Sequence, residues 1–337
     1  MVPILLFESE AVTLFRRESV ASDATRHARG APHGDKERAV KNTDRGAQAR
    51  FTPQPSVPRI GLGAMRFSIE GRPRSSRFEA IVTAAVEHGI RLIDTADSYH
   101  LPLSEPPGHN EVLIATAIRR LGVEAYVDIA TKGGHIRDSA DRVGWSVCGR
   151  PDYLRAAALA SLRRLKVETL FLYQLHRPDP KVFFEDSVGA LADLLSDGLA
   201  QSVGISNVTF EQLRSAHAIL GRDLRSVQNA HSIYRPLDPR IQAYCSHEGI
   251  QLFARSPLGG SEGARSLASI PEIVSLAKQY NITPQQLALA WVAQTAPRSI
   301  ALVGVTRLRH WLDALASQEI VLPLTKTTIE ERLRLSR

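Results

Sequence analysis

The chain is poor in cysteine, in aromatic residues and in long hydrophobic runs. Its 337 residues include two cysteines, Cys148 and Cys245, and 6% are aromatic. Two cysteines offer neither a disulfide framework nor metal-ligand spacing, so we expect them to pack in a reduced environment. No apolar run approaches the ~18 residues that a membrane span needs. We therefore predict a soluble, cytoplasmic protein with no membrane partner.

The basic charge of the chain is spread rather than clustered. The formal net charge is +7, and the Lys and Arg residues are interleaved with Asp and Glu along the chain. Nucleic-acid-binding proteins more often gather basic residues on one face and carry a recognisable reading motif. The preferred interpretation is a solvated basic surface, and nucleic acid is not expected as a partner.

Residues 1–55 differ from everything that follows them. After the apolar start MVPILLF, the segment lacks sustained periodicity and is rich in Arg, Ser, Ala, Asp and Gly. Such a composition buries little apolar surface, so we predict a disordered N-terminal extension over 1–55. A targeting segment is disfavoured because acidic residues are frequent in it, and a start codon assigned too far upstream is an alternative. Residues 321–337 are predicted to form a C-terminal tail.

Between residues 56 and 320, short apolar strands alternate with helical patterns. Helices are expected over 77–89, 110–122, 151–166, 183–198, 209–220, 239–249 and 283–294. Several of these end in glycine, as helices commonly do. Strands are expected over 59–65, 91–96, 127–132, 170–176, 201–207, 226–231, 250–256 and 300–305. Eight alternating units predict the α/β class and a single (β/α)8 TIM barrel.

A doubly wound sheet is the rival fold, and the GLGAM motif at 61–65 is the feature that favours it. The dinucleotide fingerprint of that fold requires a third glycine at position 66, where this chain has Arg66. The motif is therefore interpreted as a tight turn.

Four polar residues lie at or just beyond the ends of the first strands: Asp94, Tyr99, Lys132 and His176. A free tyrosine titrates near ~10, and a lysine ammonium beside it would lower that pKa by stabilising the phenolate. An aspartate would hold the lysine, and a histidine would hydrogen-bond a substrate oxygen. Such a set can protonate an oxygen as a carbonyl is reduced, while a cofactor supplies the hydride.

Each of the four has a structural interpretation when it is taken alone. Asp94 could cap a turn, Tyr99 could lie on a rim, Lys132 could be a solvated charge and His176 a core histidine. Their shared place at one end of successive strands favours a site, because TIM barrels build their active sites there. Ser206, Asn207 and Gln228 share that place and could pair with a nicotinamide carboxamide, although helix capping of 209–220 is an alternative for the first two.

The motifs resemble those of the aldo-keto reductase superfamily over roughly residues 58–317. In order they read GLGAM, DTADSY, TKGG, LHRPD, VGISN, VQN, SPLGG and ALVGVTR. The resemblance implies an eight-stranded barrel that reduces aldehydes and ketones with NADPH. It implies Tyr99 as general acid, Lys132 and Asp94 as the pair that tunes it, and His176 as the residue that orients the carbonyl. The cofactor site that it implies comprises Gly63, Asp94, Ser206, Asn207, Gln228, Arg255, Ser256, Leu258, Gly259, Gly304, Thr306, Arg307 and Arg309.

Three features depart from the family pattern. Arg255 stands where an aromatic residue often stacks on the nicotinamide, and the loop over 100–111 is longer than usual. Near the 2′-phosphate the chain offers Thr306, Arg307 and Arg309, while His310 and Ala314 replace the more distal Arg and Asn. The sequence of 149–191 is similar to the branch that includes pyridoxal reductases, so pyridoxal-like or broad small carbonyl substrates are expected.

The sequence therefore predicts an NADPH-dependent oxidoreductase that reduces a small aldehyde or ketone. A cofactor-binding regulatory subunit of the same superfamily is the alternative, and the long N-terminal segment is its cue. A metal-dependent barrel such as a sugar isomerase is disfavoured, because several carboxylates at strand ends are lacking and no metal is implied. The oligomeric state cannot be read from these residues.

Overall fold

The computed structural model describes residues 59–73, 76–102, 104–137 and 144–322. The predicted extension over 1–55 and the part of the predicted tail after residue 322 lie outside these residues. The description below concerns the described part of the chain alone.

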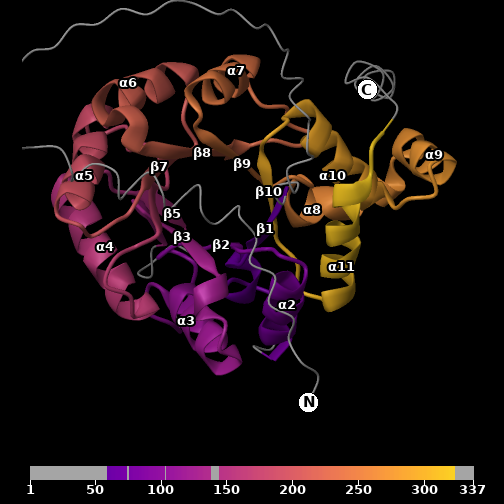
Figure 1. Cartoon of the computed structure of the whole chain (residues 1–337), viewed down its shortest axis with the longest axis horizontal. Helices are drawn as coiled ribbons and strands as arrows, with labels where there is room; N and C mark the ends of the chain where they lie inside the picture. Colours follow the sequence, from indigo (N-terminus) through magenta and orange to yellow (C-terminus); the bar gives the residue numbers. More distant parts are fainter. Residues whose placement is uncertain (1–58, 74–75, 103, 138–143, 323–337) are drawn as a thin grey trace, which may run out of the picture. The chain divides into compact units, whose positions relative to one another are not determined.

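Eight parallel strands close into a barrel, as the sequence predicts (Figure 1). Around the barrel they run in the order β1, β10, β9, β8, β7, β6, β3 and β2, and β2 pairs again with β1. The strands are β1 (Ile60–Gly63), β2 (Leu92–Asp94), β3 (Asp128–Gly133), β6 (Leu172–Leu175), β7 (Val203–Ser206), β8 (Leu224–Ala230), β9 (Gln251–Arg255) and β10 (Ile300–Val303).

Helices follow the strands and surround the barrel (Figure 1). The α-helices are α2 (Ser76–Glu87), α3 (His109–Leu121), α4 (Pro151–Leu165), α5 (Phe184–Ser196), α6 (Phe210–Leu220), α7 (Pro239–Glu248), α8 (Gly260–Ser266), α9 (Pro271–Gln279), α10 (Pro284–Thr295) and α11 (Leu308–Ala316). Short 3₁₀ segments are η1 (Met65–Phe67), η2 (Glu124–Tyr126), η3 (Gly221–Asp223), η4 (Leu267–Ser269) and η5 (Ser317–Glu319).

One hairpin of two strands and two helices were not predicted from the sequence. A hairpin of β4 (His135–Arg137) and β5 (Trp145–Val147) stands between β3 and α4, with His135 opposite Val147. Its strands are too short to show a period in the sequence. The other two are α8 and α9, which are inserted between β9 and α10. The glycine-rich sequence GSEGARS gives α8 no apolar stripe from which a helix could be predicted.

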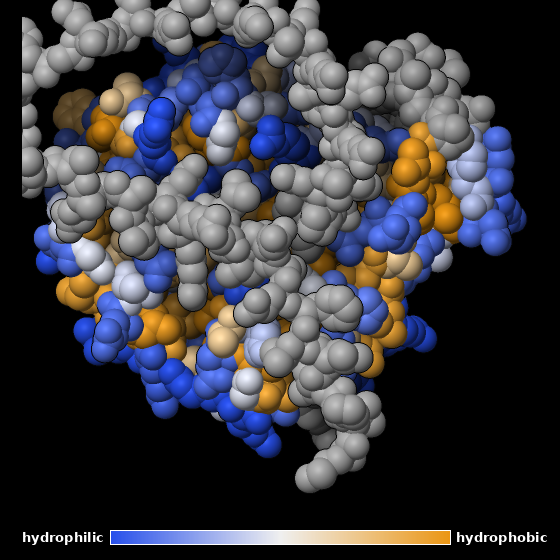
Figure 2. All heavy atoms as spheres, in the orientation of Figure 1, coloured by the Kyte–Doolittle hydropathy of each residue, from blue (hydrophilic) through white to orange (hydrophobic). Residues whose placement is uncertain are grey.

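Most of the apolar core lies between the barrel and its helices. Trp291 on α10 and Trp311 on α11 are among its largest fully buried side chains. A smaller cluster joins Ala130, Leu172, Phe253 and Leu302 from four different strands. Figure 2 shows hydrophilic residues over much of the outer surface of the helices, with hydrophobic residues between them. This is the pattern of a helix ring that packs inward on a barrel.

Strand periodicity explains why polar side chains gather at one end of the barrel. Side chains two residues apart along a strand point to the same side, so Lys132 shares the side of Ala130, and Arg255 shares that of Phe253. The same step places Gln228 above Ser226 on β8. On these three strands, a polar side chain near the carboxyl end therefore lies on this side above an apolar or small one. The sequence thus places a polar site at the carboxyl ends of the strands.

The helix caps correct one alternative interpretation of the sequence. Thr209 caps α6 by accepting from the backbone N–H of Gln212, and the Gln212 side chain accepts from the Thr209 N–H in return. Ser206 and Asn207 are consequently not the caps of this helix. Because Thr209 already accepts a hydrogen bond from the first turn of α6, Ser206 and Asn207 remain available to the site.

Candidate active site

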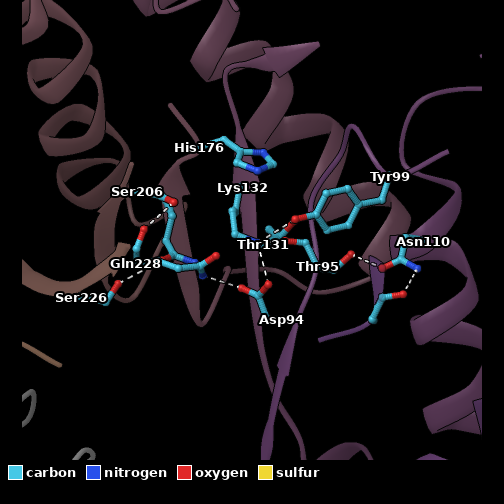
Figure 3. Close-up of polar contacts among 12 residues, drawn as sticks. Asp94, Thr95, Tyr99, Asn110, Thr131, Lys132, His176, Ser206, Ser226 and Gln228 are labelled. Atoms are coloured by element: carbon cyan, nitrogen blue, oxygen red, sulfur yellow. Dashed lines mark hydrogen bonds and ion pairs between the residues drawn. The ribbon is translucent and has the colours of Figure 1, made fainter. Parts of the chain in front are cut away.

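Lys132 lies at the centre of the site, fully buried between Asp94 and Tyr99 (Figure 3). Its ammonium Nζ donates to Asp94 Oδ2 at 2.8 Å and to the Thr95 carbonyl at 2.6 Å. It also donates to the hydroxyl of Tyr99 at 3.5 Å. Asp94, Tyr99 and Lys132 are called the proton-donor triad below. The structure brings these three residues together as the sequence predicted.

A second layer of hydrogen bonds fixes the backbone around this triad. Thr95 donates to Asn110 on α3 at 2.6 Å, and Thr131 donates to Glu111 at 2.5 Å. The other oxygen of Glu111 accepts from Arg164 on α4 at 2.5 Å. These bonds tie the ends of β2 and β3 to two helices. Thr95 and Thr131 are neighbours of Asp94 and Lys132 in sequence, so the bonds restrict these two side chains through the backbone.

The pKa of Tyr99 corrects one expectation from the sequence. Burial raises the pKa of the phenol, and the Lys132 ammonium works in the opposite direction without reversing it. The net shift is upward, whereas a downward shift was predicted. Burial also acts to lower the pKa of Lys132, but Asp94 and Tyr99 together raise it above its usual value. At neutral pH the pocket therefore holds a protonated phenol beside a charged lysine.

His176 closes the pocket above Lys132 (Figure 3). It directly follows β6, and its ring stands edge-on to that of Tyr99, with 5.7 Å between ring centres. Burial, with a further contribution from the Lys132 charge, lowers the pKa of His176 well below its usual value. Its Nδ1 is buried and has no hydrogen-bond partner among the described residues. A neutral imidazole can donate one hydrogen bond to a substrate oxygen.

Gln228 and Ser206 connect the far side of the barrel to the triad. Gln228 Nε2 donates to Asp94 Oδ1 at 2.8 Å, and Ser206 Oγ donates to the Gln228 carbonyl at 2.7 Å. Both oxygens of Asp94 are thus occupied, one by Lys132 and one by Gln228. The sequence placed Gln228 at the same barrel end but did not indicate this contact.

Asn207 joins three neighbours at the end of β7. Its amide nitrogen donates to the His176 carbonyl at 2.9 Å and to Ser206 Oγ at 3.0 Å. Its amide oxygen accepts from Arg255 Nε at 2.8 Å. Asn207 has a positive φ of 60°, which asparagine tolerates better than most residues. Arg255 therefore lies against an amide that was predicted to hold the cofactor.

The β4–β5 hairpin adds a wall that the sequence analysis missed. His135 stacks on Trp145 with ring centres 4.7 Å apart. The rings of His135 and His176 are T-shaped, with their centres 4.8 Å apart. Burial lowers the pKa of His135 to about 4, and the charge of Arg177 adds to that effect. The only signal in the sequence was the proximity of these residues to the TKGG motif.

The remaining predicted cofactor residues lie at the same ends of β1, β9 and β10. Ser256, Leu258 and Gly259 form a turn after β9, closed by a bond from the Gly259 N–H to the Ser256 carbonyl at 2.8 Å. Gly63 and Gly304 end two neighbouring strands, and a Cβ on Gly63 would lie 3.5 Å from the Gly304 nitrogen. Thr306, Arg307 and Arg309 lie at the start of α11, where both arginines are exposed. No contact joins these last three to the triad.

The loop after Tyr99 is anchored from two directions. Arg137 Nη1 on β4 donates to the His100 carbonyl at 3.0 Å. Glu105 forms an ion pair with Arg72, and its Oε1 lies 3.3 Å from Nε2 of His109. The loop therefore has fixed contacts beside the proton donor.

Comparisons with known proteins agree with the barrel and its site. The model of the aldo/keto reductase family matches residues 59–332. An uncharacterised oxidoreductase of Schizosaccharomyces pombe is 33% identical over 260 residues, which cover 75% of this chain and 79% of the relative. A probable aldo-keto reductase of Glycine max is 31% identical over 258 residues, covering 68% and 71%.

A solved structure shows the same fold. It is an aldo/keto reductase from Klebsiella pneumoniae in complex with NADP and acetate, with a TM-score of 0.67 and 26% identity. The match covers 84% of this chain and 94% of that one. The chain therefore belongs to the aldo/keto reductase family, and the predicted superfamily and TIM barrel are confirmed.

The described residues contain neither a membrane-spanning helix nor a cluster of metal ligands. None of the helices in that part of the chain is both long and apolar enough to cross a membrane. Within the same residues, no group of three or more His, Cys, Asp and Glu side chains is arranged to hold a metal ion.

Proposed function

We propose that this chain reduces an aldehyde or ketone to the alcohol, with Tyr99 as the general acid. Membership of the family makes the chain an aldo-keto reductase and NADP(H) its cofactor, the nucleotide named with the Klebsiella pneumoniae structure. The observation that carries the proton-transfer step is the contact of Lys132 Nζ with both Asp94 Oδ2 and Tyr99 Oη.

The protein side of the reaction follows from this contact. The O–H bond of Tyr99 breaks as its proton passes to the carbonyl oxygen, and the Lys132 ammonium stabilises the phenolate that remains. Asp94 keeps Lys132 charged inside a buried pocket. His176 donates a hydrogen bond to the same carbonyl oxygen and so orients it. When bound, NADPH would supply the hydride that adds to the carbonyl carbon, and NADP⁺ would remain.

The hydrogen-bond acceptors at these strand ends suit the carboxamide N–H group of a nicotinamide. Gln228 Nε2 is committed to Asp94, while its Oε1 has no hydrogen-bond partner among the described residues and can accept from a carboxamide. The Ser206 O–H donates its hydrogen bond to the Gln228 carbonyl, so Oγ can serve a ligand only as an acceptor. Asn207 Oδ1 accepts from Arg255 Nε and can accept a second hydrogen bond. The cofactor would therefore share this predicted contact with Arg255.

The test is a panel of aldehydes, ketones and pyridoxal, followed by NADPH absorbance with NADH in parallel. We expect steady consumption of NADPH with at least the simple aldehydes. Tight retention of the nucleotide with negligible turnover would reject this function and favour the regulatory subunit. Full turnover of an accepted aldehyde by Tyr99→Phe would reject Tyr99 as the acid.

A further inference from the structure

Three arginines follow or end β6, β8 and β9, at the carboxyl ends of the barrel strands and beside the site. Arg177 directly follows His176, Arg255 ends β9, and Arg235 lies in the loop after β8. The loop is held to β9, because the His231 N–H donates to the Arg255 carbonyl at 3.3 Å, and a bridge joins Ser232 to Arg235. These three arginines are called the arginine rim.

The rim charges act on one another and on the catalytic groups. The charges of Arg177 and Arg235 add to the effect of burial in lowering the pKa of Arg255. Burial is the largest cause of the pKa shifts of Tyr99 and His176, upward for the first and downward for the second, and the Arg255 charge acts to lower both pKa values. The Arg255 guanidinium is thus close enough to the reacting pair for its field to reach them.

The rim has no acidic partner in the described part of the chain. Arg137 and Arg164, which are also buried or half-buried near the site, form ion pairs with Glu70 and Glu111 respectively. Arg255 instead donates its Nε to the neutral amide of Asn207. Its two terminal nitrogens have no hydrogen-bond partner among the described residues. A half-buried guanidinium without a counter-ion is costly, and an anion that bound there would remove that cost.

We propose that the carbonyl substrate carries an anionic group, a carboxylate or a phosphate, bound by Arg255 with added charge from Arg177 and Arg235. The inference rests on the proposed reduction and names the substrate class for it. The fork of Arg255 matches a carboxylate or phosphate in two-point contact. Asn207 links Arg255 to the backbone carbonyl of His176, so the anion and the reacting carbonyl can belong to one small molecule. The stacked His135 and Trp145 offer a planar wall for an aromatic body.

The test compares aldehydes that differ only in charge. The probes are 4-carboxybenzaldehyde against its methyl ester, and pyridoxal 5′-phosphate against pyridoxal, with kcat/KM measured at low and high salt. We expect a preference of about tenfold or more for a charged member, the size of a charge-assisted hydrogen bond. The preference should shrink as salt screens the rim. The pair that shows it identifies the carboxylate or the phosphate as the anion.

Matched variants separate the rim from surface charge in general. Arg177→Gln should reduce the preference about fivefold or more, measured as the ratio of kcat/KM for the charged aldehyde to that for its neutral partner. The control is Arg222→Gln, because Arg222 lies in η3 before β8, at the opposite barrel end. It removes the same charge and should change neither this ratio nor kcat/KM for benzaldehyde.

Binding of benzoate to the full chain with NADP⁺, measured by calorimetry, gives a readout that does not need turnover. Arg177→Gln should weaken this binding by a similar factor. Equal kcat/KM for charged and neutral aldehydes would overturn the inference and leave the proposed reduction standing. Absence of all reduction would reject the proposed function. Benzoate binding that Arg177→Gln does not change overturns the inference in either case.

Discussion

The two sides of the pocket differ in how their charges are satisfied. On one side, the proton-donor triad is buried, and both oxygens of Asp94 accept hydrogen bonds from protein groups. On the other, the arginine rim is half-buried or exposed and has no carboxylate partner among the described residues. A site whose charges are satisfied by the protein keeps its geometry without substrate, whereas an unsatisfied charge is available to a ligand. The first side is thus suited to the reaction and the second to selection.

The largest expected effect comes from removing the phenolic O–H of Tyr99, the proposed proton donor. Tyr99→Phe should lower kcat by about 10²–10⁴, the usual contribution of a general acid. Binding of NADPH should be unchanged, because the lost hydroxyl contacts Lys132 alone among the described residues. Single-turnover kinetics with titration of the cofactor measure both. A fall in nucleotide affinity equal to the fall in rate would show that the phenol holds the cofactor instead.

The next effect tests whether Asp94 and Lys132 act as one unit. Lys132→Met leaves a buried carboxylate without its cation, which should lower the free energy of unfolding by about 3–5 kcal/mol. Activity should fall as well, since the phenolate loses its stabilising charge. The control is the double variant Asp94→Asn with Lys132→Met. In urea unfolding it should recover most of the stability, while its activity should remain low; recovery of both would contradict the proposed role of Lys132.

A smaller effect sharpens the assignment of Arg255, which the sequence placed with the cofactor and the structure places beside Asn207. Arg255→Phe restores the aromatic residue typical of the family and removes the rim's fork. We expect KM for 4-carboxybenzaldehyde to rise about tenfold. Arg255→Lys keeps the charge without the planar fork, so its KM should lie between those of the unaltered protein and Arg255→Phe. If Kd for NADPH rises instead and KM holds, Arg255 serves the cofactor.

The smallest effect is a pH dependence that should be nearly flat. Burial raises the pKa of Tyr99, so the phenol stays protonated beyond its usual value of ~10 and reduction should decline only above that pH. Burial lowers the pKa of His176, so the imidazole stays neutral as the pH falls below ~6.5. The value of kcat/KM for reduction should therefore change little between about pH 6.5 and 9. A decline within this range that Tyr99→Phe or His176→Gln abolishes would contradict these directions.

The parts of the site that could be predicted from sequence are those that local pattern controls. Asp94 and Lys132 end apolar strands, so their meeting follows once eight strands close into a barrel. The contact between Gln228 and Asp94 could not be predicted, since it joins residues 134 positions apart whose side-chain directions depend on register. The sign of the Tyr99 pKa shift depends on burial, which a sequence does not report.

The arginine rim was missed for a related reason. In the sequence, nothing separates Arg177 and Arg235 from the other dispersed basic residues. Each follows a strand or lies in a loop, where exposed arginine is common. Their importance depends on proximity to Arg255 and on the lack of acidic neighbours, and both are properties of the folded chain. The hairpin that carries His135 and Trp145 was missed because each of its strands has three residues.

The most direct test of this division of roles is one kinetic table. It records kcat and KM for 4-carboxybenzaldehyde and its methyl ester with the unaltered protein, Tyr99→Phe and Arg177→Gln. We predict that Tyr99→Phe lowers kcat for both aldehydes by the same factor, and that Arg177→Gln raises KM for the charged aldehyde alone. If Arg177→Gln lowers kcat for both aldehydes, or Tyr99→Phe affects only the charged one, the two sides do not divide reaction from selection.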